Sequence, residues 1–477
     1  YYKKLWILLT KQQKNKFKVV LLLLVISSLF EILSLGSLLP FITAIVSPEV
    51  IFENEYTRPI VDALEWSTKE EVRIYLTVIY ISIIVLTALF RTMLKVYEVR
   101  FIYSVGATIS RNIYKSYLLR TYSEYLLSNS SEILSDLTHK VGELISSWLT
   151  PSINILVAIV LSIATIVILV WINPVLMLST FTAFAIIYLV TIYFFKESVH
   201  KNTEIVSISA EKIIKEIQEA SGNIRDIMLH QRQNQYSDVY NLLESNLRES
   251  QAQIQILSYA PKVIIETLGI VFIAILAFIL SISGNDMLNI VVSLGLVVVG
   301  VQKITPLLNQ IYNDYISLKV GIKVGGKLLT RNKSAIVEES SNKDLSTLVF
   351  NSHVILKDVS FKYSLESNII LNKASIKIKK NSCIGVVGRS GSGKSTLSDI
   401  LLGILTPMSG AMYVDNIKLK RENIGMWKKK VAHVPQSVYL VDGTILKNIV
   451  INNDLENVDY NKLEYALRLS SFQDFVH

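Results

Sequence analysis

The sequence predicts a membrane domain of six transmembrane helices, followed by an α/β domain that carries a phosphate-binding loop (P-loop). Three observations lead to this fold class. Hydrophobic residues make up 51% of the 477 residues and charged residues only 18%, which is rare in a soluble protein of this size. Long apolar runs recur through the first 301 residues. Residues 388–395 then match the pattern G-x-x-x-x-G-K-[ST] without a mismatch.

The apolar runs predict the membrane helices. They lie at residues 19–46, 74–90, 149–171, 175–195, 259–283 and 287–301. Crossing a bilayer takes about 20 residues, and the shorter runs reach this length with their flanking amphipathic turns. Residues 91–148 and 196–258 keep helical apolar spacing, so we expect long helical extensions outside the membrane. The alternative, six buried helices of a soluble protein, fits the run lengths and flanking charges less well.

Charge predicts the orientation. The N-terminal end carries only basic residues before the first run: Lys3, Lys4, Lys11, Lys14, Lys16 and Lys18. The next loop is mostly acidic, with Glu49, Glu53, Glu55, Asp62, Glu65, Glu70 and Glu71 against Arg58 and Lys69. By the positive-inside rule the N-terminal end and the P-loop domain are cytosolic in a multi-pass protein of the inner (plasma) membrane. The net charge of +9 is explained in this way without nucleic-acid binding. Residues 3–10 are predicted to form a short helix that lies in the interface between membrane and water.

Ionisable residues inside the spans are candidates for function. They are Glu31 in the first span, Arg91, Lys95 and Glu98 on one face of the second, Lys262 and Glu266 in the fifth, and Lys303 before Pro306 at the end of the sixth. One interpretation is a charged cavity that accepts an anionic head group. The other is a set of ion pairs between helices, with lysines reaching toward the membrane surface.

The P-loop predicts a site for a nucleotide phosphate chain. Its glycines let the backbone N–H groups point at phosphate oxygens. We expect Lys394 to reach the β- and γ-phosphates and the Ser395 hydroxyl to ligate Mg²⁺. Residues 384, 386 and 387 are predicted to form a buried strand before the loop, and a helix is expected after it. Cys383, the single cysteine, is expected to be a small core residue, so no internal disulfide exists.

Other short patterns surround the P-loop. Residues 354–361 alternate as a strand does, and Tyr363 follows, where an aromatic ring would stack on adenine; an ordinary strand tyrosine is the alternative. A turn and a further strand are predicted at residues 407–415. The segments V-P-Q at residues 434–436 and D-G-T-I-x-x-N-I at residues 442–449 follow.

In this order and spacing, the motifs resemble the nucleotide-binding domain of an ATP-binding cassette exporter. The resemblance implies the type I exporter fold, ATP and Mg²⁺ as cofactors, and a homodimer that hydrolyses ATP. It implies that Tyr363 stacks on adenine and that the Walker A loop comprises Gly388, Arg389, Ser390, Gly391, Ser392, Gly393, Lys394 and Ser395, with Thr396 adding a hydroxyl. Gln436 would sense Mg²⁺ and the attacking water. The coupling segments would fall near residues 122–128 and 224–232.

The expected organisation is a transmembrane domain at residues 1–330, a linker at 331–350 and the N-terminal part of the cassette domain at 351–477. The nucleotide-binding domain is expected to be truncated at its C-terminal side. The resemblance places the signature motif, the Walker B aspartate, the catalytic glutamate and the switch histidine after residue 477. We therefore expect this fragment to bind nucleotide weakly and not to turn it over.

A closer resemblance concerns the membrane half. Residues 30–43 (F-E-I-L-S-L-G-S-L-L-P-F-I-T) and the P-K-x-x-x-E-x-x-G at residues 261–269 resemble the bacterial flippases of lipid-linked oligosaccharides. The resemblance implies a lipid-linked glycan substrate, whose pyrophosphate would meet Arg91, Lys95 and Lys303. Another lipid, a drug-like amphiphile or a peptide are alternative substrates. A membrane-tethered P-loop kinase or GTPase and a non-hydrolysing sensor are alternative functions.

Overall fold

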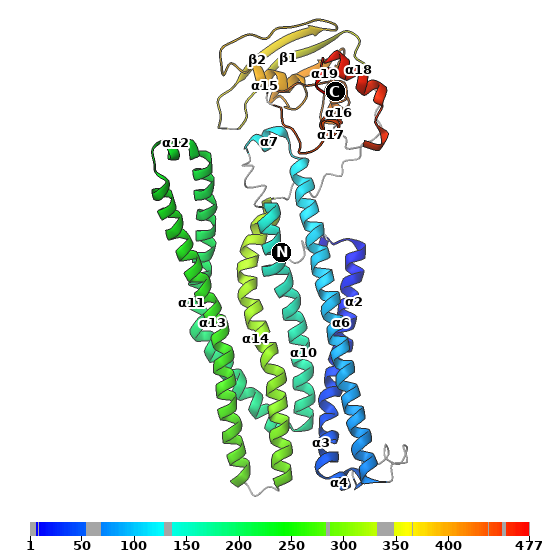
Figure 1. Ribbon diagram of the computed structural model, residues 1–477, viewed down its shortest axis with the longest axis vertical. Helices are drawn as coiled ribbons and strands as arrows, with labels where there is room; N and C mark the ends of the chain where they lie inside the picture. The colour runs from blue at the N-terminus through cyan, green and yellow to red at the C-terminus, as the bar shows by residue number, and fades with distance from the viewer. Residues whose placement is uncertain are drawn as a thin grey trace. The chain divides into compact units, whose positions relative to one another are not determined.

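The computed structural model describes residues 6–7, 9–53, 68–127, 136–282, 287–331, 348–364, 366–436, 438–450 and 455–476. The chain divides into two compact units, Tyr1–Ser341 and Asn342–His477, and each is described by itself (Figure 1).

The first unit is helical throughout its described residues. Its elements are α2 (Lys11–Gly36), α3 (Leu38–Val46), α4 (Pro48–Glu53), α6 (Lys69–Leu118), α7 (Tyr122–Leu127), the π-helical turn η1 (Asp136–Lys140), α9 (Val141–Leu144), the π-helical turn η2 (Ile145–Leu149), α10 (Thr150–Ile172), α11 (Pro174–Gly222), α12 (Ile224–Leu229), α13 (Gln233–Ile282) and α14 (Met287–Arg331). Six helical segments are long and apolar enough to cross a membrane, which confirms the predicted six spans. The sixth lies at Ser293–Lys319, further along the chain than the run at 287–301 suggested.

Local sequence signals set the starts of these helices. The Thr10 side chain accepts a hydrogen bond from the backbone N–H of Gln13, whose side chain bonds back to Thr10, and α2 begins after this capping box. Thr68 and Glu71 make the same arrangement before α6. Asn173 caps α11, which then begins with Pro174.

Several helices are far longer than a bilayer requires. The 50 residues of α6 correspond to about 75 Å of helix, whereas the hydrocarbon core is about 30 Å thick. The predicted helical extensions are therefore confirmed for the described residues. Two short helices, α7 and α12, lie in the predicted coupling segments. Helix α12 connects α11 to α13 at one end of this helical pair (Figure 1). Most of the predicted outer loop, at residues 54–67, lies outside the described residues.

The main core of this unit lies between α2, α6, α9, α10 and α14. Its buried side chains include Leu24, Leu94, Trp148, Leu161 and Leu307. The turn η2 packs unusually close to its neighbours. A Cβ atom at Gly321 of α14 would overlap the carbonyl group of Ser147, so only glycine allows this approach of the two backbones.

The second unit contains a four-stranded antiparallel sheet in the order β2-β1-β3-β4. Its elements are β1 (His353–Phe361), β2 (Leu371–Lys379), α15 (Lys394–Leu401), β3 (Ser409–Val414), β4 (Ile417–Lys418), α16 (Ile424–Lys428), α17 (Ile445–Ile449), the 3₁₀-helix η4 (Leu455–Asn457), α18 (Tyr460–Leu469) and α19 (Gln473–Val476). The strands predicted at residues 354–361 and 407–415 are confirmed. Leu356, Val359, Ile400, Val414 and Trp427 form the centre of the core.

The strand predicted before the P-loop is wrong. Residues 382–389 have no regular secondary structure, and Ile384, Val386 and Val387 are 44%, 50% and 94% exposed. A strand needs a hydrogen-bonded neighbour, and none of the four strands pairs with this segment. For the same reason Cys383 is exposed, not in the core as expected.

Candidate functional site

The P-loop has the backbone shape that a phosphate chain requires. Gly391 and Gly393 have φ angles of +81° and +86°, in the left-handed region that favours glycine. Helix α15 begins at Lys394, immediately after the loop. The N-terminal N–H groups of α15 and the positive end of its dipole can therefore face an anion held by the loop.

Lys394 folds over the loop that precedes it. Its Nζ donates hydrogen bonds of 2.8 Å to the carbonyl oxygens of Gly388 and Arg389. Phosphate oxygens would give the ammonium group charged acceptors in place of these neutral ones. The exposed hydroxyl of Ser395 is a suitable Mg²⁺ ligand. These residues fit a nucleotide with its magnesium ion, which would be held by the loop, Lys394 and Ser395.

Tyr363 and Thr396 are brought together. Their hydroxyl oxygens lie 3.0 Å apart, and the Tyr363 ring packs edge-on against Phe361 with centroids 5.1 Å apart. Thr396 is only 4% exposed. The contact of the Thr396 hydroxyl with a phosphate stays a prediction.

The structure places Gln436 outside the helices and strands of the second unit. It is exposed, in a segment at residues 431–436 without helix or strand, and no hydrogen bond joins it to residues 388–396 in the described part of the chain. His433, three residues earlier, lies close to Asp399 of α15. Burial raises the pKa of Asp399, and the nearby His433 opposes that rise.

The membrane unit contains a cavity of about 510 Å³, which we call the α6 pocket. It is lined by Ala88, Arg91, Thr92, Leu94, Lys95, Glu98, Val157, Leu161, Leu307 and Gln310. Two of the predicted substrate residues, Arg91 and Lys95, therefore face one cavity with Glu98. Residues of α10 and α14 form other parts of its wall.

Lys95 is held by neighbours in the wall of this pocket. Its Nζ lies 2.9 Å from Glu98 Oε1 and 3.0 Å from Asn154 Oδ1. The Asn154 amide donates in turn to Asp314 Oδ1 at 3.4 Å. Arg91 differs, because within the described residues no ion pair or hydrogen bond to its side chain is found. Arg91 is thus the uncompensated cation of the α6 pocket.

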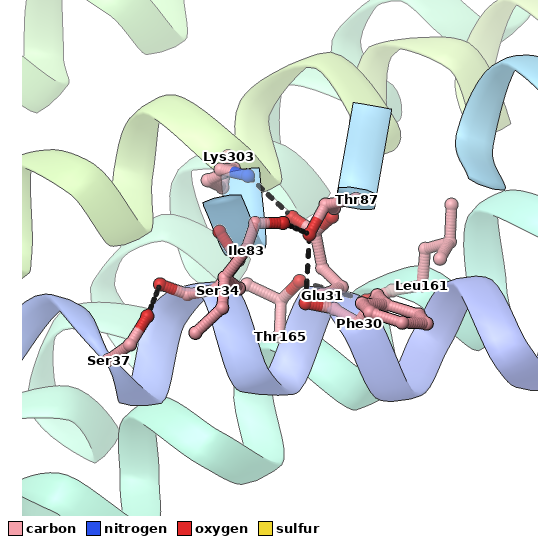
Figure 2. A network of polar contacts seen from close by, with 9 residues as sticks. All are labelled: Phe30, Glu31, Ser34, Ser37, Ile83, Thr87, Leu161, Thr165 and Lys303. Carbon is pink, nitrogen blue, oxygen red and sulfur yellow. Dashed lines mark hydrogen bonds and ion pairs between the residues drawn. The ribbon is translucent and has the colours of Figure 1, made fainter. Parts of the chain in front are cut away.

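Lys303 is engaged elsewhere. Its Nζ lies 2.7 Å from Glu31 Oε1, joining α14 to α2 (Figure 2). The Glu31 side chain is 5% exposed and that of Lys303 32%. Beside this pair the Thr87 hydroxyl of α6 donates to the Phe30 carbonyl oxygen at 3.2 Å. Lys303 is thus paired with Glu31 and, within the described residues, is not among those that line the α6 pocket.

A second cavity of about 730 Å³ lies between α13 and α14. Its lining includes Lys262, Glu266, Gln302, Thr305 and Asn309. Lys262 Nζ is 3.9 Å from Glu266 Oε1, and about half of each side chain is exposed, so this pair is weak.

The sequence analysis missed three polar residues near the α6 pocket: Asn154, Gln310 and Asp314. A signal for two of them was present. Lys303, Leu307, Gln310 and Asp314 recur at spacings of four, three and four, which places them on one face of α14.

Comparison with known proteins covers both units. Residues 19–301 match the family described as the ABC transporter transmembrane region, and residues 371–475 match the family described as ABC transporter. A putative export ATP-binding/permease protein of Rickettsia typhi is 28% identical over 284 residues, which is 56% of this chain and 47% of that protein.

Two further relatives are described as transporting named cargoes. The alpha-hemolysin translocation ATP-binding protein HlyB of Escherichia coli O6:H1 is 29% identical over 169 residues, 35% of this chain and 23% of that protein. The lacticin-481/lactococcin-DR transport/processing ATP-binding protein of Lactococcus lactis is 38% identical over 118 residues, 25% of this chain and 16% of that protein. The chain thus spans less than half the length of each of these relatives.

Proposed function

The chain belongs to the ABC transporter family, and we propose that it is part of an ATP-driven exporter. It is a multi-pass membrane protein with a six-span domain followed by an ATP-binding cassette domain. The proposed exporter is a homodimer in the inner (plasma) membrane, with the cassette domain in the cytosol. Its cargo is an amphiphile with an anionic head group. A lipid-linked oligosaccharide is the first such cargo to test.

One observation carries the choice of an anionic cargo. Arg91 faces the α6 pocket and has no partner among the described side chains. A phosphate that enters the pocket meets this unpaired cation, which can donate charge-assisted hydrogen bonds to it, and the mostly apolar walls leave room for a lipid portion.

We propose the following transport cycle. ATP held by the P-loop and Lys394 would draw two cassette domains together, with Tyr363 stacked on adenine and Ser395 and Gln436 at the metal. Gln436 and the segments around α7 and α12 would transmit that closure to the membrane helices. Hydrolysis would reset the transporter.

A peptide or protein is the second candidate cargo. The names of the Escherichia coli and Lactococcus lactis relatives support it, and the family relationship fits it equally well. The unpaired charge of Arg91 favours the lipid cargo. A phosphate head group requires a cation in the binding site, whereas a peptide has no general requirement for one.

The test uses the full-length protein in liposomes. ATP-dependent flipping of a polyprenyl-pyrophosphate oligosaccharide is measured for the wild type, Lys394→Ala and Arg91→Gln. The proposal expects flipping by the wild type alone. ATP hydrolysis without flipping would reject this cargo and direct the search to other lipids and to peptides.

A further inference from the structure

The charged residues near the α6 pocket are nearly all compensated. Lys95 has Glu98 and Asn154, and Lys303 has Glu31. Only Arg91 has no such neighbour in the described ranges of the chain. One cation in three is therefore free to meet an anionic head group.

The Glu31–Lys303 pair lies close to the pocket wall. Leu161, which lines the pocket, accepts a hydrogen bond of 2.9 Å from the Thr165 hydroxyl through its carbonyl oxygen, and Figure 2 labels both residues in the network that includes the pair. Lys303 precedes the pocket residue Leu307 by one turn of α14, and Thr87, which bonds to the neighbour of Glu31, precedes Arg91 by one turn of α6. On both helices, the residue at the pair therefore lies one turn from a residue that lines the pocket.

Lys303 is also the cation whose release depends on one group. A single carboxylate, that of Glu31, holds it, whereas two side chains hold Lys95. Glu31 is 4% exposed, so its charge has little access to water and depends on the ammonium group for compensation. The carboxylate of Glu31 therefore competes with any substrate anion for Lys303.

From these contacts we propose that Glu31 is a specificity-determining residue, which withholds Lys303 from the α6 pocket and so limits each chain to one cation for an anionic head group. The wild-type pocket then takes a monophosphate linkage with little disadvantage relative to a diphosphate. Neutralising Glu31 frees Lys303, and the pocket gains a second cation that favours the diphosphate. This inference rests on the proposed export of anionic amphiphiles.

The experiment compares two lipids with the same polyprenyl chain and the same glycan, one joined through a monophosphate and the other through a diphosphate. ATP-dependent transport of each is measured with the full-length protein in liposomes. The readout is the ratio of diphosphate to monophosphate transport, which a general loss of activity leaves unchanged.

Glu31→Gln is expected to raise this ratio about tenfold, which corresponds to about 1.4 kcal/mol. Glu31→Gln combined with Lys303→Gln removes the freed cation and returns the ratio to the wild-type value. Glu266→Gln, which neutralises the acid of the other pair, leaves the ratio unchanged. If Glu31→Gln does not fold, Glu31→Asp keeps the charge but shortens the side chain, and an intermediate rise is expected.

Two results would overturn the proposal, and they are distinguishable. If the wild type transports these lipids and Glu31→Gln leaves the ratio of diphosphate to monophosphate transport unchanged, the role of Glu31 is refuted and the proposed function stays intact. A wild-type protein that hydrolyses ATP and transports neither lipid refutes the proposed function, and the role of Glu31 falls with it.

Discussion

The hydroxyl groups of Tyr363 and Thr396 lie 3.0 Å apart, which ties the predicted adenine-stacking ring to the helix that follows the P-loop. Thr396 is the third residue of α15. One hydrogen bond thereby joins the predicted base site to the predicted phosphate site, and its contribution can be separated from that of the ring.

Removing the ring of Tyr363 should weaken ATP binding much more than removing its hydroxyl group. Stacking of a base on an aromatic side chain contributes about 1–3 kcal/mol, so Tyr363→Ala should lower ATP affinity by about tenfold or more. Tyr363→Phe keeps the ring and should change affinity less than threefold, because the lost hydrogen bond joins two protein side chains and its ~1 kcal/mol contributes to folding rather than to ATP binding. Titration with a fluorescent ATP analogue measures both. Equal losses would show that the ring does not stack on the base.

Lys394→Ala should abolish stabilisation of the protein by nucleotide. A ligand at 100 times its Kd stabilises a folded protein by about 2.7 kcal/mol, and loss of the ammonium group removes the main charge that holds the β- and γ-phosphates. Thermal unfolding with and without MgATP measures this effect. Lys418→Ala, an exposed lysine of β4, is the control and should keep the full shift. An undiminished shift in Lys394→Ala would place the nucleotide elsewhere.

Lys303→Gln should destabilise the membrane unit, because it leaves the Glu31 carboxylate buried without a cation. Breaking a buried ion pair by removing one partner costs about 3–5 kcal/mol. The double variant Glu31→Gln/Lys303→Gln should recover most of this loss. Lys262→Gln is the matched control, since the half-exposed Lys262–Glu266 pair contributes at most about 1 kcal/mol. Unfolding of the protein in lipid nanodiscs gives the comparison, and equal effects of the two single lysine variants would contradict it.

Asp415 should make the stability of the second unit depend on pH in the acid range. Backbone N–H groups of Asn351, His353 and Ser352 donate to its carboxylate and lower its pKa below the ordinary 3.8. A depressed folded-state pKa means that the stabilisation is complete above the unfolded-state value and is lost as the pH falls through the folded-state value. Asparagine tolerates the positive φ of 53° at this position. As the pH falls below 3.8, Asp415→Asn should therefore lose less stability than the wild type. The free energy of unfolding is measured by denaturation at a series of pH values. Parallel curves of this free energy against pH for the wild type and Asp415→Asn would contradict the prediction.

Gly321→Ala should disturb the packing of α14 against η2. The added methyl group would overlap the backbone at Ser147, and overpacking of this kind costs about 1–3 kcal/mol. Gly295→Ala is the control on the same helix, because its Cβ atom would lie 3.9 Å from Ile42 Cδ1, an ordinary contact. Thermal stability of the purified variants distinguishes the two sites, and a Gly321→Ala protein as stable as Gly295→Ala would refute the close approach.

The features that depend on local sequence could be predicted. The six spans follow from apolar run length, the starts of α2 and α6 from capping residues, and the turn at Gly391 and Gly393 from the P-loop pattern. Each of these depends on residues that are neighbours in the chain.

Features that depend on distant neighbours could not be predicted. Apolar residues 384–387 indicated a buried strand, but burial depends on a pairing strand that the pattern does not name. Lys303 stays a predicted substrate residue, but its partner Glu31 lies 272 residues away in the sequence, and no local pattern identifies that pair. In the sequence, Arg91 and Lys303 are both simply basic residues of a span. The structure distinguishes them because a carboxylate lies beside Lys303, whereas none is found beside Arg91 among the described residues.

The π-helical turns also determine where this part of the chain tolerates a change in length. A π turn absorbs one more residue than an α turn, so deleting one residue from Ile145–Leu149 would let the turn close as an α-helix. Pro151 and the rest of α10 would then keep their present faces. The same deletion within residues 152–160 would rotate one part of α10 relative to the other by about 100° and turn Leu161 away from the pocket that it lines. Natural length variation in this region is therefore expected to concentrate at the two π turns.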